Sequence, residues 1–233
     1  MLTIRGLNTL YGSAQALFDI DLEVDAGAVM ALLGRNGAGK STLLKSTIGL
    51  VRPATGSIVF AGQEILGKAV HLVVRCGLGY VPEERRIFTS LSVDENLSVG
   101  RRPPQSGLSA WSPERIYDLF PSLAGMRRRL GREMSGGEQQ MLAIARTLMG
   151  NPKMILLDEP SQGLAPRVIE ALADSLTALK GQGLTVLICE QNVRFAERLA
   201  DRATVLETGQ VRWRGTMADF AADIAAQHDL LHV

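Results

Sequence analysis

The sequence predicts an α/β fold with a mostly parallel sheet, an antiparallel β part near the N-terminus and an inserted helical subdomain. Three observations support this: a β-rich first third, helical periodicity in the middle, and apolar strand-length runs that alternate with helical patterns at the end. The 233 residues, 46% of them hydrophobic and 21% charged, suit one compact domain. We expect a core at 1–84 and 151–233 and a helical subdomain at 85–150.

The first third predicts several strands and one prominent helix. Residues 19–24 alternate polar and apolar side chains, as a half-buried strand does, and a turn at 25–27 follows. Residues 29–33 form a short apolar run, and 43–49 are apolar at helical spacing, closed by glycine. The remaining predicted elements here are a strand at 57–60, a helix at 68–76 and a short buried strand at 79–81.

The pattern then becomes helical from about residue 84 to 150, broken by a loop at 100–107. The α/β alternation resumes after Asn151-Pro152. The predicted elements are a strand at 154–157, a helix at 166–179, a strand at 184–189, a helix at 193–200, a strand at 203–206, a turn at 207–210 and one amphipathic helix at 216–231.

Composition excludes several classes of protein. A net charge of +1 argues against a nucleic-acid binder, and the basic triplet 127–129 is more typical of a solvated helix end. No apolar stretch approaches the ~20 residues that a membrane span needs, and residues 1–5 lack a signal-peptide layout. We therefore expect a cytoplasmic chain that reaches a membrane only through a partner. Cys76 and Cys189, each in an apolar run, are predicted to be reduced core thiols.

The most informative segment, residues 34–42, fits the pattern G-x-x-x-x-G-K-[ST] between a predicted strand and a predicted helix. In this context, backbone N–H groups and the helix N-terminus form a phosphate site. Lys40 would reach the β- and γ-phosphates of a nucleoside triphosphate, and the Ser41 hydroxyl would bind Mg²⁺. The residues that we assign to nucleotide binding are Gly34, Asn36, Gly37, Ala38, Gly39, Lys40, Ser41 and Thr42.

Two carboxylates follow the apolar strand at 154–157. A buried strand that ends in an acid is how P-loop enzymes hold Mg²⁺, and Asp158 fits that role. Glu159, one residue further, would point elsewhere and could polarise the attacking water.

A second glycine-rich helix start lies at Ser135-Gly136-Gly137. Ser135 and Glu138 form a capping box, which by itself stabilises a helix start. Two glycines in the first turn cost stability, however, and bare backbone there invites an anion. This helix end therefore either serves its own fold or faces a nucleotide held by another copy.

Together these segments resemble the ATP-binding cassette family over essentially the whole chain. Residues 34–42, 135–140 and 155–160 are similar to its Walker A, signature and Walker B motifs, in the right order. In that family two cassettes stack head to tail, so the resemblance implies that Ser135, Gly136 and Gly137 complete an ATP site in a second ATPase subunit, in a homodimer or a paralogous heterodimer. Residues 161–165 resemble the loop that links the two sites.

The resemblance also implies that Tyr11 stacks on adenine; the alternative is a core aromatic at a strand end. Three positions depart from the usual family pattern: Glu83, Gln191 and Ala165 replace the common glutamine, histidine and aspartate. These departures resemble the LivF-type ATPase subunit of importers for branched-chain and other hydrophobic amino acids. Glutamine hydrogen-bonds but does not titrate, so we expect Gln191 to position phosphate. Glu83 could approach Mg²⁺ or couple the site to a transmembrane partner.

The resemblance therefore implies an ATPase subunit at the cytoplasmic face of the cell membrane. Its expected partners are permease subunits, docked in a groove that includes residues 86–88, and indirectly a periplasmic or extracellular binding protein. Glu159, Lys40 and Gln191 would be the catalytic residues. Alternatives are the ATPase of a urea or amide importer and an ATPase of cofactor assembly; the signature-type helix start argues against a P-loop small-molecule kinase.

Overall fold

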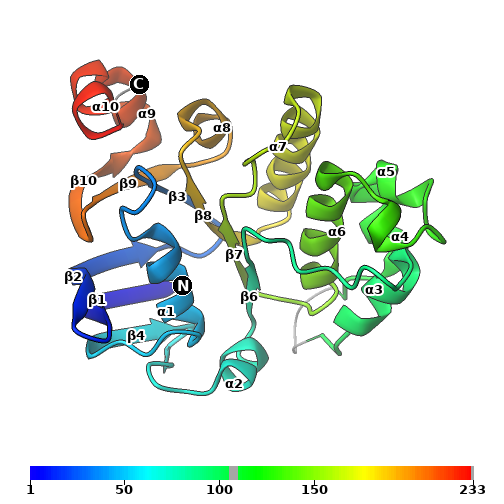
Figure 1. Ribbon diagram of the computed structural model, residues 1–233, viewed down its shortest axis with the longest axis horizontal. Helices are drawn as coiled ribbons and strands as arrows, with labels where there is room; N and C mark the ends of the chain where they lie inside the picture. Colours follow the sequence, from blue (N-terminus) through cyan, green and yellow to red (C-terminus); the bar gives the residue numbers. More distant parts are fainter. Residues whose placement is uncertain (105–109, 232–233) are drawn as a thin grey trace.

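A computed structural model describes residues 1–104 and 110–231 of the chain (Figure 1). The strands form one six-stranded and one four-stranded sheet. Of the predicted loop at 100–107, the part from residue 105 lies outside the described residues.

The larger sheet carries most of the predicted strands. Its order is β10-β9-β3-β8-β7-β6, in which the first pair is antiparallel and all other neighbours are parallel. The prediction of a mostly parallel sheet is therefore confirmed. The bounds are β3 Val29–Leu33, β6 Leu78–Val81, β7 Met154–Asp158, β8 Thr185–Glu190, β9 Arg202–Glu207 and β10 Gln210–Thr216.

The smaller sheet is antiparallel and lies near the N-terminus, as predicted. Its order is β2-β1-β4-β5. Ile20, Leu22 and Val24 are buried, which confirms the alternation seen in 19–24. The bounds are β1 Leu2–Tyr11, β2 Ala14–Val24, β4 Thr55–Phe60 and β5 Gln63–Glu64.

Both faces of the parallel sheet are buried, because alternate residues of each strand enter different cores. In β3, Ala31 and Leu33 join a core with α6, α7 and α8, whereas Met30 and Leu32 join a core with α1, α2 and the antiparallel sheet. The helices concerned are α1 Lys40–Ile48, α2 Val70–Arg75, α6 Gly136–Leu148, α7 Pro166–Gly181 and α8 Val193–Glu197.

The chain between β6 and β7 is helical and, in its described part, contributes no strand. Figure 1 shows α3–α6 at one end of the molecule, opposite the antiparallel sheet. The helical pattern expected from residue 84 is wrong for 84–92: the first helix begins at Val93, where Ser92 and Glu95 form a capping box. The division into core and helical subdomain stays a prediction. The additional bounds are α3 Val93–Gly100, α4 Pro113–Leu119, α5 Pro121–Ala124 and the 3₁₀ helix Gly131–Glu133.

The C-terminal part differs from its prediction in two ways. The single helix expected at 216–231 is wrong; two helices, α9 Met217–Ala222 and α10 Ile224–Leu231, meet at Asp223. Asp223 leaves the helical region with ψ 78°, and its carboxylate accepts the N–H of Ala226 at 2.9 Å, as a helix cap does. Strand β10 was not predicted, because arginines occupy alternate positions of this edge strand.

Three smaller expectations have mixed outcomes. Cys189 is a fully buried thiol, as predicted, but Cys76 at the end of α2 is only half-buried. The basic triplet 127–129 lies in turns after α5, not at a helix end, and the Arg127 guanidinium lies 4.1 Å from the centre of the Tyr117 ring. Among the described residues, no helix is both long and apolar enough to cross a membrane.

Candidate active site

The loop between β3 and α1 needs glycine at two positions for steric reasons. Gly34 has φ 153°, and a Cβ there would lie 2.4 Å from the Leu206 carbonyl oxygen. Gly39, with φ 106°, has the Leu17 side chain 2.9 Å from the same position. A larger residue would collide with backbone at Gly34 and would be strained by the positive φ at both positions, so the loop keeps its bare backbone and turns directly into the start of α1 at Lys40.

A hollow of about 470 Å³ lies over this loop and collects most of the predicted nucleotide-binding residues. Glu83 and Glu159 line it as well, from the ends of β6 and β7. The loop residues that line it are Arg35, Asn36, Gly37, Ala38, Gly39, Lys40, Ser41 and Thr42. Tyr11 is 50% exposed, with its hydroxyl 3.5 Å from Thr42 Oγ1, so it is not a core residue.

Lys40 and Glu159 form a buried ion pair at the base of the hollow. The Lys40 ammonium lies 2.8 Å from Glu159 Oε1, and both side chains are almost wholly buried. Lys40 also donates to the carbonyls of Gly34 at 2.6 Å and Arg35 at 3.1 Å. An anion that enters the loop would compete with Glu159 and these carbonyls for the same ammonium.

Asp158 points away from Glu159 and toward the start of α1. Its Oδ1 accepts the Ser41 hydroxyl at 2.8 Å, and its Oδ2 accepts the Tyr80 hydroxyl at 3.1 Å. Burial raises the pKa of Asp158, and these two hydrogen bonds oppose that rise because they favour the charged form. The two adjacent acids therefore face different partners, Ser41 and Lys40.

Gln191 follows β8 and lies against both the loop and Glu159. Its amide Nε2 is 2.5 Å from Asn36 Oδ1 and 3.4 Å from Glu159 Oε1. The structure therefore brings together Lys40, Glu159, Gln191 and the loop residues, although they come from three separate parts of the sequence.

Glu190, next to Gln191, is a buried acid that was not predicted as functional. Its two carboxylate oxygens accept the N–H and the hydroxyl of Ser161, each at 2.9 Å. Burial raises the pKa of Glu190 to about 7, with the Ser161 hydrogen bonds acting against the rise and the nearby Glu159 charge adding to it. Glu190 thus connects the end of β8, just before Gln191, to the loop at 161–165.

We expect Glu190 to make stability depend on pH. Its folded pKa of about 7 lies above the ordinary 4.5, so the folded state holds a proton that the unfolded state releases. This contribution is complete below about pH 4.5 and is lost as pH rises through 7, with a total of roughly 3 kcal/mol. Urea unfolding of wild type and Glu190→Gln between pH 5.5 and 8.5 should show a smaller decline for the variant. Parallel declines would contradict the assignment.

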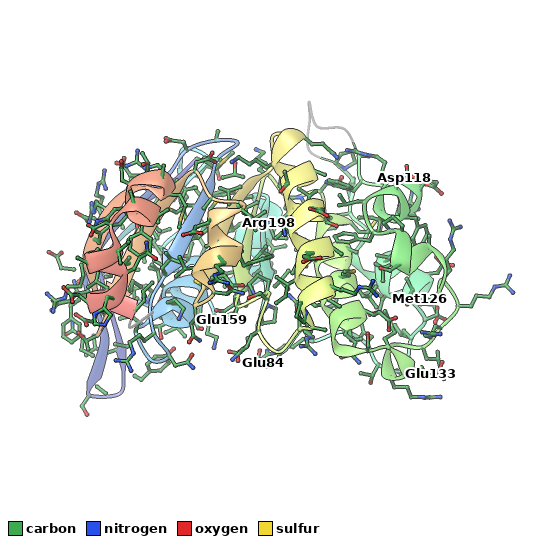
Figure 2. The ribbon with its side chains drawn as sticks, turned by 90° about the horizontal axis from the view of Figure 1, so that it is seen from above. Glu84, Asp118, Met126, Glu133, Glu159 and Arg198 are labelled. Atoms are coloured by element: carbon green, nitrogen blue, oxygen red, sulfur yellow. The ribbon has the colours of Figure 1, made fainter. Side chains whose placement is uncertain are left out.

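The signature-like segment starts α6 but is not part of the hollow. Ser135 and Glu138 form the predicted capping box: Ser135 Oγ accepts the Glu138 N–H at 3.4 Å, and the Glu138 carboxylate accepts the Ser135 N–H at 2.7 Å. The described residues lining the hollow do not include Ser135, Gly136 or Gly137. In Figure 2, Glu159 and Glu133, two residues before Ser135, lie toward the same side of the molecule but are separated along its length.

The two glycines of this segment have different surroundings. A Cβ on Gly136 would meet only the end of the flexible Arg85 side chain, 2.7 Å from Nη1. A Cβ on Gly137 would lie 2.5 Å from Cγ1 of Val168, in the first turn of α7. Gly137 therefore allows α6 and α7 to pack closely, whereas Gly136 has no comparable packing role.

We expect Gly137→Ala to lower the free energy of unfolding by about 1–3 kcal/mol, because the added methyl group overpacks the α6–α7 contact. The double variant Gly137→Ala/Val168→Ala should recover much of this loss by making room. Urea unfolding of both proteins checks this. A fully stable Gly137→Ala protein would show that the helices separate freely.

Several residues at the site were not found from the sequence. Phe18, which lies in the stretch of β2 where its pairing with β1 shifts register, and the β9–β10 turn at 208–209 line the hollow. Tyr80 contacts Asp158, and Glu190 contacts Ser161. Both contacts depend on the pairing of strands that are far apart in the sequence. Ala165 is the N-cap residue of α7, and its methyl side chain provides no capping hydrogen bond. Pro166 follows at the first helical position.

The fold and this arrangement define a class of protein: the P-loop nucleoside triphosphatases. The sequence pattern of the ABC transporter family matches residues 17–162. The chain belongs to the ABC transporter family, and it binds and hydrolyses ATP.

Curated relatives cover nearly the whole chain. It is 43% identical over 218 residues to the high-affinity branched-chain amino acid transport ATP-binding protein BraG of Pseudomonas aeruginosa, covering 94% of each. It is 35% identical to the probable branched-chain amino acid transport ATP-binding protein LivF of Archaeoglobus fulgidus, over 93% of this chain and 92% of that one. The lipopolysaccharide export system ATP-binding protein LptB of Haemophilus influenzae is 36% identical, over 93% and 90%. The predicted LivF-type resemblance is confirmed.

Solved structures agree with this assignment. The ADP conformation of MJ1267, an ATP-binding cassette of an ABC transporter, superimposes with a TM-score of 0.84 at 25% identity. The match covers 100% of this chain and 97% of that one.

Proposed function

We propose that this protein is the ATPase subunit of an importer for branched-chain or other hydrophobic amino acids. The observation that carries this substrate class is the 43% identity to BraG over 94% of both chains. The LptB relatives at 33–36% identity make lipopolysaccharide export the second candidate. Urea or amide import and cofactor assembly remain alternatives on the family resemblance alone.

Lys40, Ser41 and Asp158 would hold the phosphates and Mg²⁺. The donors near the start of α1 are oxygens, a hydroxyl and a carboxylate, which is the chemistry that Mg²⁺ prefers. Among the described residues no group of three acidic, histidine or cysteine side chains could hold a metal alone. That fits Mg²⁺, which usually takes one or two carboxylates together with substrate phosphates. Glu83, at the edge of the hollow, is a further candidate ligand. Bound Mg²⁺ would neutralise phosphate charge.

Glu159 and Gln191 would act on the γ-phosphate. The Glu159 carboxylate is paired with the Lys40 ammonium. Once phosphate binds that ammonium, Glu159 would be released and positioned to accept a proton from water. The Gln191 amide, held between Asn36 and Glu159, can donate to a phosphate oxygen without changing its charge. Phosphoryl transfer depends mostly on such positioning and electrostatic stabilisation.

Ser135 and Gly136 would act on the nucleotide of a second subunit. They lie outside this chain's own hollow, yet α6 offers an accessible N-terminus with bare backbone. A head-to-tail dimer, of two copies or of this chain and a paralogue, brings such a helix end to the opposite phosphate loop. Exposed Tyr11, beside Thr42, is placed to stack on the adenine.

A groove of about 360 Å³ is our candidate docking site for permease subunits. It runs between α2 and the C-terminal end of α6. Of the exposed large apolar side chains in the described residues, three line it: Leu50 (51% exposed), Phe88 (46%) and Val99 (56%). Arg146 also lines it, and its buried Nη1 has no hydrogen-bond partner. An apolar helix that offers a carbonyl or carboxylate would fit, and it would place this subunit at the cytoplasmic face of the membrane.

Reconstitution tests the substrate class. The chain would be co-expressed with the membrane subunits of a branched-chain amino acid importer and placed in proteoliposomes with the matching binding protein. We expect ATP-dependent uptake of labelled leucine, isoleucine or valine, lost in Phe88→Asp because the groove no longer accepts an apolar helix. Lipopolysaccharide or urea transport without amino acid uptake would contradict the proposal.

A further inference from the structure

Both oxygens of Asp158 are already engaged by hydroxyl groups. Ser41 donates to Oδ1 at 2.8 Å and Tyr80 donates to Oδ2 at 3.1 Å. Asp158 itself is 1% exposed, so water cannot replace either donor freely. Because the Ser41 hydroxyl donates a hydrogen bond to Asp158, the lone pairs of its oxygen point away from that carboxylate. The direction of those lone pairs therefore depends on how the carboxylate is oriented.

Strand register explains why Tyr80 reaches this carboxylate. Tyr80 on β6 is paired with Leu156 on β7, and Asp158 follows Leu156 by two residues on the same face of the sheet. The Tyr80 ring packs against the core on that face, which includes Leu43 and Leu44 of α1. A packed ring of this kind has few alternative rotamers, so its hydroxyl is a fixed donor.

We propose that Tyr80 is a positioning residue for metal-dependent nucleotide binding: it fixes Asp158 Oδ2, which turns Oδ1 toward Ser41 and directs the Ser41 lone pairs to Mg²⁺. The proposal rests on the assignment of Ser41 and Asp158 under the proposed function. Tyr80 itself is not among the residues that line the hollow over the phosphate loop.

Loss of the Tyr80 hydroxyl should lower the affinity for Mg²⁺ and leave metal-free nucleotide binding unaffected. Without the Tyr80 hydroxyl, the buried Asp158 loses one of its two donors and is free to turn. Residues that orient a metal ligand in this way typically change metal affinity by about 10- to 100-fold. Phosphate contacts from the loop and Lys40 do not involve Tyr80, so metal-free nucleotide binding stays unchanged.

The experiment measures binding of a non-hydrolysable ATP analogue by calorimetry, in EDTA and over a Mg²⁺ titration, for wild type and Tyr80→Phe. Tyr117→Phe is the matched control, because the Tyr117 hydroxyl also donates to a carboxylate, Asp94, in the helical part of the chain. We expect the Mg²⁺ concentration for half-saturation to rise about tenfold in Tyr80→Phe only, with equal affinities in EDTA.

The outcomes separate this inference from the proposed function. Asp158→Asn should weaken Mg²⁺-dependent binding; if it does and Tyr80→Phe matches wild type, the role of Tyr80 is overturned. A Tyr80→Phe protein that loses affinity equally with and without Mg²⁺ has a general structural defect, which also overturns it. If Asp158→Asn leaves the Mg²⁺ dependence unchanged, the metal assignment itself fails.

Discussion

Glu159→Gln should reduce ATP turnover by at least about 100-fold while ATP still binds, because the amide cannot accept a proton from the attacking water. The substitution keeps the size of the side chain and can still accept a hydrogen bond from Lys40. It also removes the charge that competes with phosphate for Lys40, so ATP affinity should be equal to or higher than in wild type. Steady-state turnover and equilibrium ATP binding, measured on the same preparations, test both parts.

Glu84→Gln is the matched control for this variant. Glu84 is exposed, pairs only loosely with Arg86 at 3.5 Å, and lies on the same side of the molecule as Glu159 (Figure 2). It makes the same change of charge without contact to Lys40 and should leave turnover unchanged. A Glu159→Gln protein that turns over ATP like Glu84→Gln would remove Glu159 from the chemistry.

Lys40→Met should have two separate effects. Loss of the ammonium removes charge-assisted bonds to phosphate worth about 1.5–3 kcal/mol each, so ATP affinity should fall at least about tenfold. The same change leaves Glu159 as a buried carboxylate without its cation, and breaking a buried ion pair in this way typically costs about 3–5 kcal/mol of stability. Urea unfolding and equilibrium ATP binding measure the two effects independently.

The double variant Lys40→Met/Glu159→Gln distinguishes them. Its stability should return toward wild type, because the unpaired charge is gone, whereas its ATP affinity should stay low. If the double variant is as unstable as Lys40→Met, the ion pair is not the source of the stability loss. Recovered ATP affinity in the double variant would show that Lys40 does not bind phosphate.

The phosphate loop and the two acids at the end of β7 could be predicted because their chemistry is local in sequence. A strand, a glycine turn and a helix start follow one another within residues 29–48. Backbone sterics explain why glycine occupies positions 34 and 39 of the turn. Asp158 and Glu159 were also expected to point in different directions; in the structure β7 ends at Asp158, and Glu159 turns out of the strand with φ 47°. The roles of these residues in catalysis stay predictions until they are measured.

Contacts between distant segments could not be predicted. Tyr80 reaches Asp158 across 78 residues of sequence, through a strand pairing that no local pattern reveals. The Glu190–Ser161 contact likewise needs the register of β8 and the turn after β7. The break at Asp223 was missed because an amphipathic pattern continues through it, while the side-chain cap that starts α10 depends on local geometry.

The central claim is that two subunits complete each ATP site, and a mixing experiment tests it most directly. Gly136→Asp should fold well, because an acid is favourable at the N-terminus of α6 and only the mobile end of Arg85 must yield. Its charge would repel a phosphate presented by another subunit. The Lys40→Met/Glu159→Gln protein has the opposite defect: its own loop is inactive, but its α6 start is intact.

ATP turnover should be measured for each of these two proteins alone and for their mixture at high concentration. Our account predicts little activity from either protein and clear recovery in the mixture, where one site combines an intact loop with an intact helix start. A strictly monomeric Gly136→Asp protein that hydrolyses ATP at the wild-type rate would contradict it.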